Sequence, residues 1–388
     1  MSDLGLTMDT EPRSRRRGKN SGSGSRGRRK EKRGRSGCAV FLAFSIVIAV
    51  IATGGWYAYG FIKDRFGPPP DYSGAGVEGS SVVVVVESGW GGAQIGNELK
   101  RAQVVKSVDA FTKVYTADKM QRNIKAGAYV MKKHMSAKSA FSYMVEDKNR
   151  ETATLPEGTR VSKVYEILAQ KMKIDPKEFE AAAKDPSIGL PAWANGQIEG
   201  FLFPMQYPVA PGMKPVDVLR GMVETTMNKI VKLDVENRAR AVGKSPYEIL
   251  IIASMIQAEA KQDADFGKIS RVIYNRLNAK PAMKLGFDST VNYGLNRNDI
   301  VVTNDQTRQD HPWNTYTRNG LPQTPINNPG QDAFEAALDP VPGDWLYFVT
   351  INLETGETLY AKTAAEHEKN KEKFEAYMEA QKDKKNGG

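Results

Sequence analysis

The chain has 388 residues, and its 55 Lys and Arg against 45 Asp and Glu give a formal net charge of +10. Residues 1–36 hold twelve of the basic and four of the acidic residues, so the remaining 43 basic and 41 acidic residues nearly cancel, which argues against a basic nucleic-acid-binding body. The single cysteine, Cys38, excludes a disulfide framework, and the widely spaced His134, His311 and His367 form no metal-binding motif, so we expect neither a metal site nor a cofactor.

An uncharged stretch follows the basic tail. Residues 37–62 contain no charged side chain and begin with the nearly continuous apolar run CAVFLAFSIVIAVI. About 20 apolar residues span the hydrocarbon core of a bilayer, and Trp56, Tyr57 and Tyr59 suit the interface at the far end. The pattern predicts one transmembrane helix over residues 37–62.

The basic tail predicts the orientation of this helix. Basic residues beside a span stay in the cytoplasm, so everything after the helix is expected outside the plasma (inner) membrane. A cleaved signal peptide is the alternative, but the basic region is long for one and the apolar run exceeds the usual length. Attraction to anionic lipid accounts for the arginines without nucleic acid as a partner, and the Ser/Gly/Arg composition predicts disorder over residues 1–36.

The part of the chain expected outside the membrane, residues 63–388, divides into regions of different composition. Residues 63–79 are rich in proline and glycine and predict a linker. Residues 80–150 predict a small α+β subdomain with strands at 80–87 and 126–131 and helices at 92–102, 107–116 and 135–146. Residues 151–380 form the larger domain, which includes an expected core strand at 345–349 and a charged, solvated helix from residue 366. Residues 381–388 are expected to be a disordered tail.

The segment SPYEILIIASMIQAEA, residues 245–260, carries the chemistry. Ser245, Pro246 and Glu248 make a helix start with a capping box, and the apolar residues that follow predict a buried central helix. Glu259 ends this helix, where apolar surroundings and the negative end of the helix dipole both disfavour a charged carboxylate. A carboxyl kept protonated is what a general acid requires, although the segment alone also fits a helix that simply reaches solvent at Glu259.

Several motifs in order resemble those of the endolytic murein transglycosylase family (MltG/YceG-like). They are TLPEG (154–158), EGFLFP (199–204), ASMIQAE (253–259), YNRL (274–277), FDSTVNYG (287–294), NTYT (314–317), GLPQTPINNPG (320–330) and LYFV (346–349). The family glutamate falls on Glu259, whereas Gln257 replaces an acid found in many members, and Met205 and Gln206 replace an Asp and a Thr.

This resemblance implies the fold class and the activity. The fold is expected to be α+β, with a LysM-like subdomain followed by a mixed α/β YceG-like catalytic domain. The activity is expected to be that of a lytic transglycosylase, a carbon–oxygen lyase that cleaves peptidoglycan strands between N-acetylmuramic acid and N-acetylglucosamine and leaves 1,6-anhydro ends. Glycan strands are the expected substrate, peptidoglycan synthases are expected partners, and termination of strand growth is the expected role.

One carboxyl is enough for this reaction, so Glu259 is expected to act first as acid and then as base. The candidates for substrate contact are Glu199, Asp288, Asn314, Tyr316 and Gln323. One alternative is a muramidase-type hydrolase that pairs Glu259 with Glu199 or Asp288. Another is a non-catalytic wall-binding scaffold, for which Glu259→Gln would be silent in cells and deletion of residues 80–150 would not.

Overall fold

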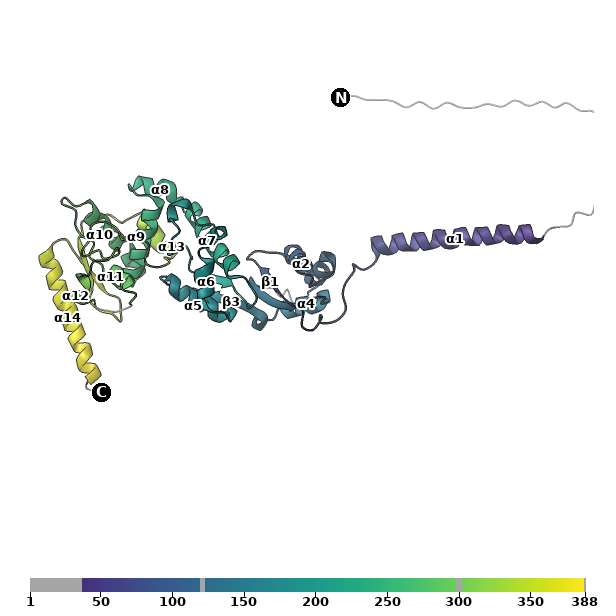
Figure 1. Ribbon diagram of the computed structural model, residues 1–388, viewed down its shortest axis with the longest axis horizontal. Coiled ribbons are helices and arrows are strands. Elements are labelled where there is room, and N and C mark those ends of the chain that lie inside the picture. The colour runs from purple at the N-terminus through teal and green to yellow at the C-terminus, as the bar shows by residue number, and fades with distance from the viewer. Residues whose placement is uncertain (1–36, 119–122, 298–301, 387–388) are drawn as a thin grey trace, which may run out of the picture. The chain divides into compact units, whose positions relative to one another are not determined.

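The computed structural model describes residues 37–118, 123–297 and 302–386, so the predicted basic tail lies outside the described residues. The chain divides into two units at Pro68. The first contains helix α1 (Gly37–Phe66), in which Phe41–Lys63 is long and apolar enough to cross a membrane and has no side chains buried inside the protein (Figure 1). These 23 residues extend about 34 Å along the helix axis, enough for a hydrocarbon core of about 30 Å.

The second unit begins with the small α+β region that the sequence predicted. Strands β1 (Ser81–Val86) and β2 (Gly127–Lys132) pair antiparallel, with Val84 opposite Tyr129. Three helices accompany them: α2 (Gly92–Arg101), α3 (Val108–Thr116) and α4 (Ala137–Met144). All five elements lie within a few residues of their predicted positions, because each carries a strong local pattern and buries its apolar residues in one core that includes Leu99, Phe111 and Phe141.

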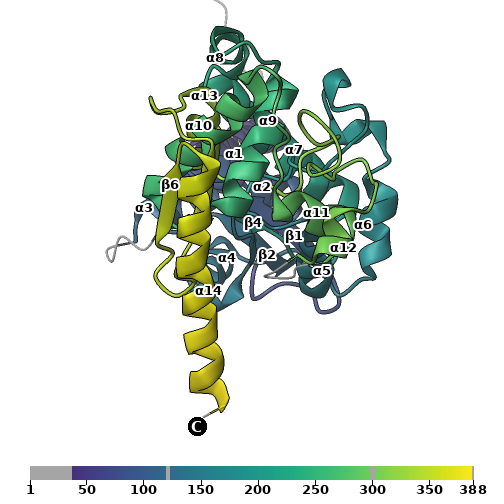
Figure 2. The ribbon, with the colours of Figure 1, turned by 90° about the vertical axis from the view of Figure 1, so that its left-hand side faces the viewer.

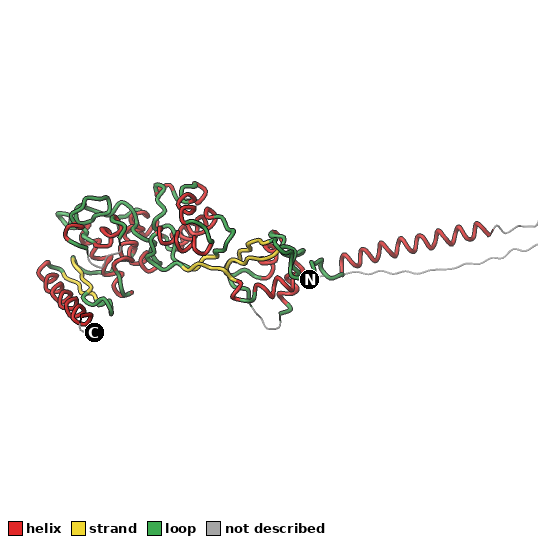
Figure 3. The backbone as a smooth tube through the Cα atoms, turned by 60° about the horizontal axis from the view of Figure 1, so that its bottom comes forward, coloured by secondary structure: helices red, strands yellow, loops and turns green. Residues whose placement is uncertain are grey.

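One antiparallel sheet continues across the predicted boundary at residue 150. Its order is β1-β2-β3-β4, with β3 (Arg150–Thr154) and β4 (Gln206–Pro208). Tyr129 pairs with Arg150, and Ala153 pairs with Tyr207. Figure 3 shows these strands as one yellow run between helical regions. The hydrophobic cores on the two sides of this boundary are nevertheless separate clusters.

The larger region is mainly helical with a few short strands, so the chain as a whole has the mixed α+β class expected. Its helices are α5 (Val161–Met172), α6 (Pro176–Ala182), α7 (Pro215–Lys232), α8 (Val235–Ala241), α9 (Pro246–Glu259), α10 (Phe266–Asn278), α11 (Asp288–Gly294), α12 (Asn304–Thr307), α13 (Gln331–Leu338) and α14 (Ala364–Asn386), with short 3-10 turns at Asp147–Asn149, Pro186–Ile188, Ala192–Ala194 and Asp263–Asp265. Helix α9 packs against α8, α10, α11 and α13, and its residues from Ile249 to Ile256 are all buried. The predicted central helix is therefore confirmed.

A long segment after α12 is fastened to α9 by polar contacts. Ser254 Oγ accepts from the Ile326 N–H at 3.0 Å, and its carbonyl accepts from Asn327 Nδ2 at 2.9 Å. Gly200 has φ +89, and a Cβ there would lie 2.9 Å from Pro325, so only glycine lets the 199–204 segment approach this closely. These contacts hold the predicted motif segments around the C-terminal end of α9.

The C-terminal strands form a separate hairpin, β5 (Tyr347–Thr350) with β6 (Thr358–Ala361). The strand predicted at 345–349 is present as β5, but its residues are half-buried rather than fully buried, with Phe348 packed against the large core. Helix α14 packs on this hairpin, and Figure 2 shows it running beside β6. Its helical structure extends to Asn386, which includes most of the tail expected to be disordered.

Candidate active site

Helix α9 delivers Glu259 to the site, and its start is set by local chemistry. The Glu248 N–H donates to Ser245 Oγ at 3.2 Å, and the Ser245 N–H donates to Glu248 Oε2 at 2.8 Å, which completes the predicted capping box. Glu259 is the last residue of the helix, three residues after the fully buried Ile256. The carboxyl therefore sits at the negative end of a buried helix.

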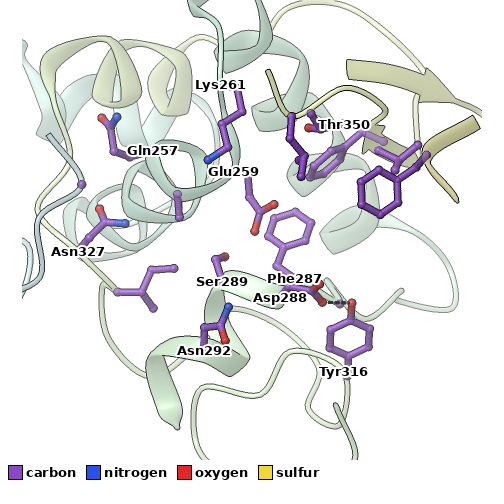
Figure 4. Close-up of a pocket in the computed structure, with 18 of the residues that line it drawn as sticks. Gln257, Glu259, Lys261, Phe287, Asp288, Ser289, Asn292, Tyr316, Asn327 and Thr350 are labelled. Carbon is purple, nitrogen blue, oxygen red and sulfur yellow. Dashed lines mark hydrogen bonds between the residues drawn. The ribbon is translucent and has the colours of Figure 1, made fainter. Parts of the chain in front are cut away.

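A cavity of about 850 Å³ opens at this helix end. Several parts of the chain line it: the turn around Glu157, the end of α9, Arg276 of α10, the start of α11, Tyr316, the segment with Ile326 and Asn327, strand β5 and the first turns of α14. Figure 4 shows the Glu259 carboxyl pointing into the space bounded by Phe287, Asp288 and Ser289. A cavity of this size and mixed lining fits a ligand of several rings.

Glu259 has an unusual environment for a carboxyl group. Burial raises its pKa above the ordinary value, and the nearby charge of Asp288 raises it further. The Ser289 hydroxyl and N–H, which lie near the carboxyl without forming a hydrogen bond to its Oε1, and the Lys261 cation oppose this shift in part. Glu259 Oε1 is buried and lacks a hydrogen-bond partner among the described residues. The group is thus biased toward its protonated form, and its Oε1 makes no hydrogen bond to the described part of the chain.

Two further buried polar atoms near Glu259 are also unpartnered within the described chain. They are Ser289 Oγ and Asn327 Oδ1, and both residues line the same cavity. The orientation of the Asn327 amide is set by its Nδ2, which donates to the Ser254 carbonyl. An unsatisfied buried polar group costs about 1–3 kcal/mol, so three of them in one cavity indicate a site that a polar ligand completes.

Asp288 and Tyr316 form a pair on the wall of the cavity. Tyr316 OH donates to Asp288 Oδ1 at 2.6 Å. Burial raises the pKa of Asp288, and the hydrogen bond from Tyr316 works against that rise. Two carboxyl groups with raised pKa values therefore share one cavity, which is common at sites of proton transfer.

Arg276 ties the hairpin to this site. Its guanidinium donates to the Leu346 carbonyl at 2.6 Å and also to the Leu285 carbonyl. It lies 5.3 Å from the ring centroid of Tyr347 and 5.7 Å from that of Phe287. These contacts hold β5 against the segment that carries Asp288 and Ser289.

Comparison with known proteins identifies the family. The sequence profile of the YceG-like family matches residues 84–373. This chain belongs to the YceG-like family. It is similar to the endolytic murein transglycosylase of Bacillus subtilis (strain 168), with 30% identity over 313 residues that cover 76% of this chain and 85% of that protein.

Two other relatives support the same family. The endolytic murein transglycosylase of Streptococcus pneumoniae (strain R6) is 26% identical over 366 residues, which cover 86% of this chain and 64% of that longer protein. The crystal structure of a YceG-like protein from Listeria monocytogenes aligns with a TM-score of 0.51 and 27% identity, over 75% of this chain and 99% of that one.

The structure of this YceG-like protein brings three of the predicted site residues together. Glu259, Asp288 and Tyr316 line the cavity, whereas Asn314 and Gln323 do not. The buried Asn314 amide donates to the carbonyls of Thr307 and Gln309, and its Oδ1 accepts from the Tyr316 N–H at 2.8 Å. Asn314 thus shapes the loop that presents Tyr316. Gln323 is exposed on the same long segment.

Glu199 is also absent from the cavity lining, although it is only 7% exposed. Its carboxylate accepts from the Val161 N–H at 3.0 Å, Tyr293 OH at 3.1 Å and Asn328 Nδ2 at 3.3 Å. Burial raises its pKa to about 7 despite these donors and the nearby Arg160. With its oxygens occupied in this way, Glu199 is suited to joining α5, α11 and the long segment that contains Asn328.

The sequence analysis missed the cavity residues that lack a local signature. Ser289 and Asn327 lie within family motifs, but nothing in their spacing marks them as site residues. His367, Lys371 and Phe374 line the cavity from α14, so the prediction that this helix is only a solvated face is wrong. Among the described residues, no group of His, Cys, Asp and Glu is arranged to hold a metal ion.

Proposed function

We propose that this protein is a membrane-anchored endolytic lytic transglycosylase that cleaves peptidoglycan strands between N-acetylmuramic acid and N-acetylglucosamine. The observation that carries the proposal is the Glu259 carboxyl, which lines a large cavity, has a raised pKa and has an Oε1 with no hydrogen-bond partner in the described chain. Membership of the YceG-like family and similarity to two endolytic murein transglycosylases support it.

The first step needs the protonated form of Glu259. Its proton passes to the glycosidic oxygen as the bond from that oxygen to C1 of N-acetylmuramic acid breaks, and N-acetylglucosamine leaves with a new hydroxyl. Burial favours the acid form that this step consumes. The carboxylate that results is then stabilised by the Lys261 cation and the Ser289 dipoles, which favour the charged state.

The second step uses the same residue as a base. The Glu259 carboxylate takes the proton of the C6 hydroxyl, and O6 bonds to C1, so the product is a 1,6-anhydro end and Glu259 is protonated again. No water is consumed. Ser289 Oγ and Asn327 Oδ1, which are unpartnered within the described structure, are suited to hydrogen bonds with the hydroxyl and acetamido groups of the sugar.

The proposal also assigns roles to the rest of the chain. In this proposal α1 is a retained anchor, the N-terminus is cytoplasmic, and residues 69–388 are outside. The region of β1, β2 and α2–α4 serves as a LysM-like glycan-binding subdomain. Cleavage of nascent strands would end their growth, with peptidoglycan synthases as partners.

Mass spectrometry of the products tests the proposal. Purified protein should release fragments with anhydro ends, and Glu259→Gln should release none while keeping its unfolding temperature. Glu224→Gln, an equivalent change at an exposed residue of α7, is the matched control and should cleave normally. Release of anhydro fragments by Glu259→Gln would refute the assignment.

A muramidase-type hydrolase is the second candidate, because Asp288 lines the same cavity and influences the pKa of Glu259. A hydrolase needs a second carboxyl to activate water or to attack C1, and its product is heavier by one water. Asp288→Asn separates the two reactions. A transglycosylase should keep making anhydro ends, and a hydrolase that uses Asp288 should lose its reducing-end product.

A further inference from the structure

The cavity lining is richer in cations than a neutral sugar backbone requires. Its basic residues are Arg160, Lys261, Arg276 and Lys371, and its carboxyl groups are Glu157, Glu259 and Asp288. Two of the three carboxyl groups have raised pKa values and so carry less negative charge at a given pH. The lining therefore favours a ligand that carries negative charge.

Two of the four cations are engaged by the fold. Arg276 donates to two backbone carbonyls and lies over two rings, and Arg160 lies 5.3 Å from the centroid of the Tyr293 ring. Lys261 makes no ion pair within the described part of the chain. Among the described residues Lys371 pairs with Glu368 alone, one turn before it on α14, at 3.2 Å, and both side chains are exposed. An exposed pair of this kind is weak, so Lys371 is available to a ligand.

Contacts with the β5–β6 hairpin hold helix α14 so that Lys371 lines the cavity. His367 stacks on Tyr347 with ring centroids 5.1 Å apart, and Tyr347 in turn lies next to Arg276. Gln381 donates to Glu354 in the hairpin turn at 3.1 Å. Phe374, three residues after Lys371 on the same helix, lines the same cavity and adds an apolar surface to it.

We propose that Lys371, together with Phe374 and with Lys261 at the end of α9, binds the carboxylate-bearing peptide side chain of the muramoyl residue. This inference rests on the proposed function and names a feature of its substrate. Lys371 supplies an ion pair to a carboxylate of the peptide, and Phe374 packs against its alanine methyl groups. Strands that bear intact peptides are then better substrates than strands that lack this charge.

The test compares three substrates with the full-length protein in detergent micelles. They are uncrosslinked strands with intact peptides, the same strands after conversion of their carboxylates to carboxamides, and strands freed of peptides by an amidase. The measured quantity is kcat/KM for intact strands divided by kcat/KM for amidated strands. If a variant lowers the amount of folded protein, both values fall by the same factor and the ratio does not change.

Lys371→Gln should lower this ratio by about three- to fivefold, as expected for loss of an exposed ion pair. Lys369→Gln is the matched control, because Lys369 is an exposed residue of the same helix outside the cavity lining, and it should keep the wild-type ratio. Glu368→Gln frees Lys371 from its partner and should raise the ratio slightly.

An unchanged ratio in Lys371→Gln overturns the inference. Equal cleavage of intact and peptide-free strands also overturns it, because the peptide would then add nothing beyond what the lactyl carboxylate, which the amidase frees from its amide bond, can supply. Neither result bears on the proposed function, which fails instead if the wild-type protein makes no anhydro ends from any of the three substrates.

Discussion

Two glutamates in this protein, the buried Glu199 and the half-buried Glu259, have opposite surroundings. Glu199 and Glu259 both have a pKa raised by burial, yet Glu199 is held by three hydrogen-bond donors, whereas Oε1 of Glu259 has none within the described chain. Glu199 connects α5 to α11 and to the long segment after α12, and Glu259 faces the cavity. The difference teaches that a raised pKa alone does not identify a catalytic acid, since a free oxygen in a cavity is also required.

The sharpest test of this contrast is activity. Glu259→Gln should lower kcat by about 10²- to 10⁴-fold, the usual contribution of a general acid and base. Glu199→Gln should retain most of the activity of whatever fraction stays folded. The rate at which each variant releases soluble fragments from purified strands, divided by its amount of folded protein, measures both activities. Loss of activity in Glu199→Gln with an intact fold would break the comparison and return Glu199 to the reacting centre.

The free energy of unfolding should respond in the reverse order, with the larger loss in Glu199→Gln. Glu199→Gln places an amide N–H₂ among three donors, so it should lower the free energy of unfolding by about 1–3 kcal/mol. Glu259→Gln removes a buried carboxyl without breaking a hydrogen bond to Oε1, and should leave that free energy unchanged or higher. Urea unfolding of residues 69–388 at constant pH measures both variants.

The pH dependence of stability sharpens the same contrast. The pKa of Glu199 is about 7 in the folded protein and near 4.5 when unfolded, so the folded state binds more protons between these values. Its contribution to stability is therefore complete below about pH 4.5 and is lost as the pH rises through 7, with a slope of at most about 1.4 kcal/mol per pH unit. Glu199→Gln should remove this slope. A slope that persists unchanged would assign it to other groups, such as Glu259 and Asp288.

Neighbouring hydroxyl groups offer a smaller test of the same idea. Ser289 Oγ has no partner within the described residues, whereas Thr290 Oγ1 donates to the Phe287 carbonyl at 2.6 Å and lies 2.9 Å from Thr315 Oγ1. Ser289→Ala should lower kcat/KM by about five- to tenfold without destabilising the fold, and Thr290→Val should destabilise the fold. Parallel activity and thermal unfolding measurements check this. A destabilised Ser289→Ala would mean that its hydroxyl serves the fold.

The smallest expected effect concerns Lys261. Its cation lowers the pKa of Glu259, so Lys261→Met should raise that pKa. Because the first step needs the protonated acid, the decline of kcat/KM at high pH should then begin at a higher pH. A pH profile of strand cleavage measures the shift, and Lys369→Met serves as the control. A shift toward lower pH would contradict the proposed electrostatics.

The sequence by itself determined those features that depend on neighbouring residues. The long apolar helix α1, the capping box of α9, the small α+β region and the position of Glu259 at a helix end all follow from local spacing and composition. Each uses contacts within a few residues, so the pattern is visible in the chain.

Only the tertiary structure decided which groups share the cavity. The contacts of Glu199 join residues 38, 94 and 129 positions apart, and the Asn327–Ser254 contact joins residues 73 apart. The role of α14 was hidden as well, because its charged residues follow no amphipathic pattern that marks Lys371 as facing a cavity. Whether a buried polar group is satisfied depends on distant partners, and periodicity and spacing cannot supply that information.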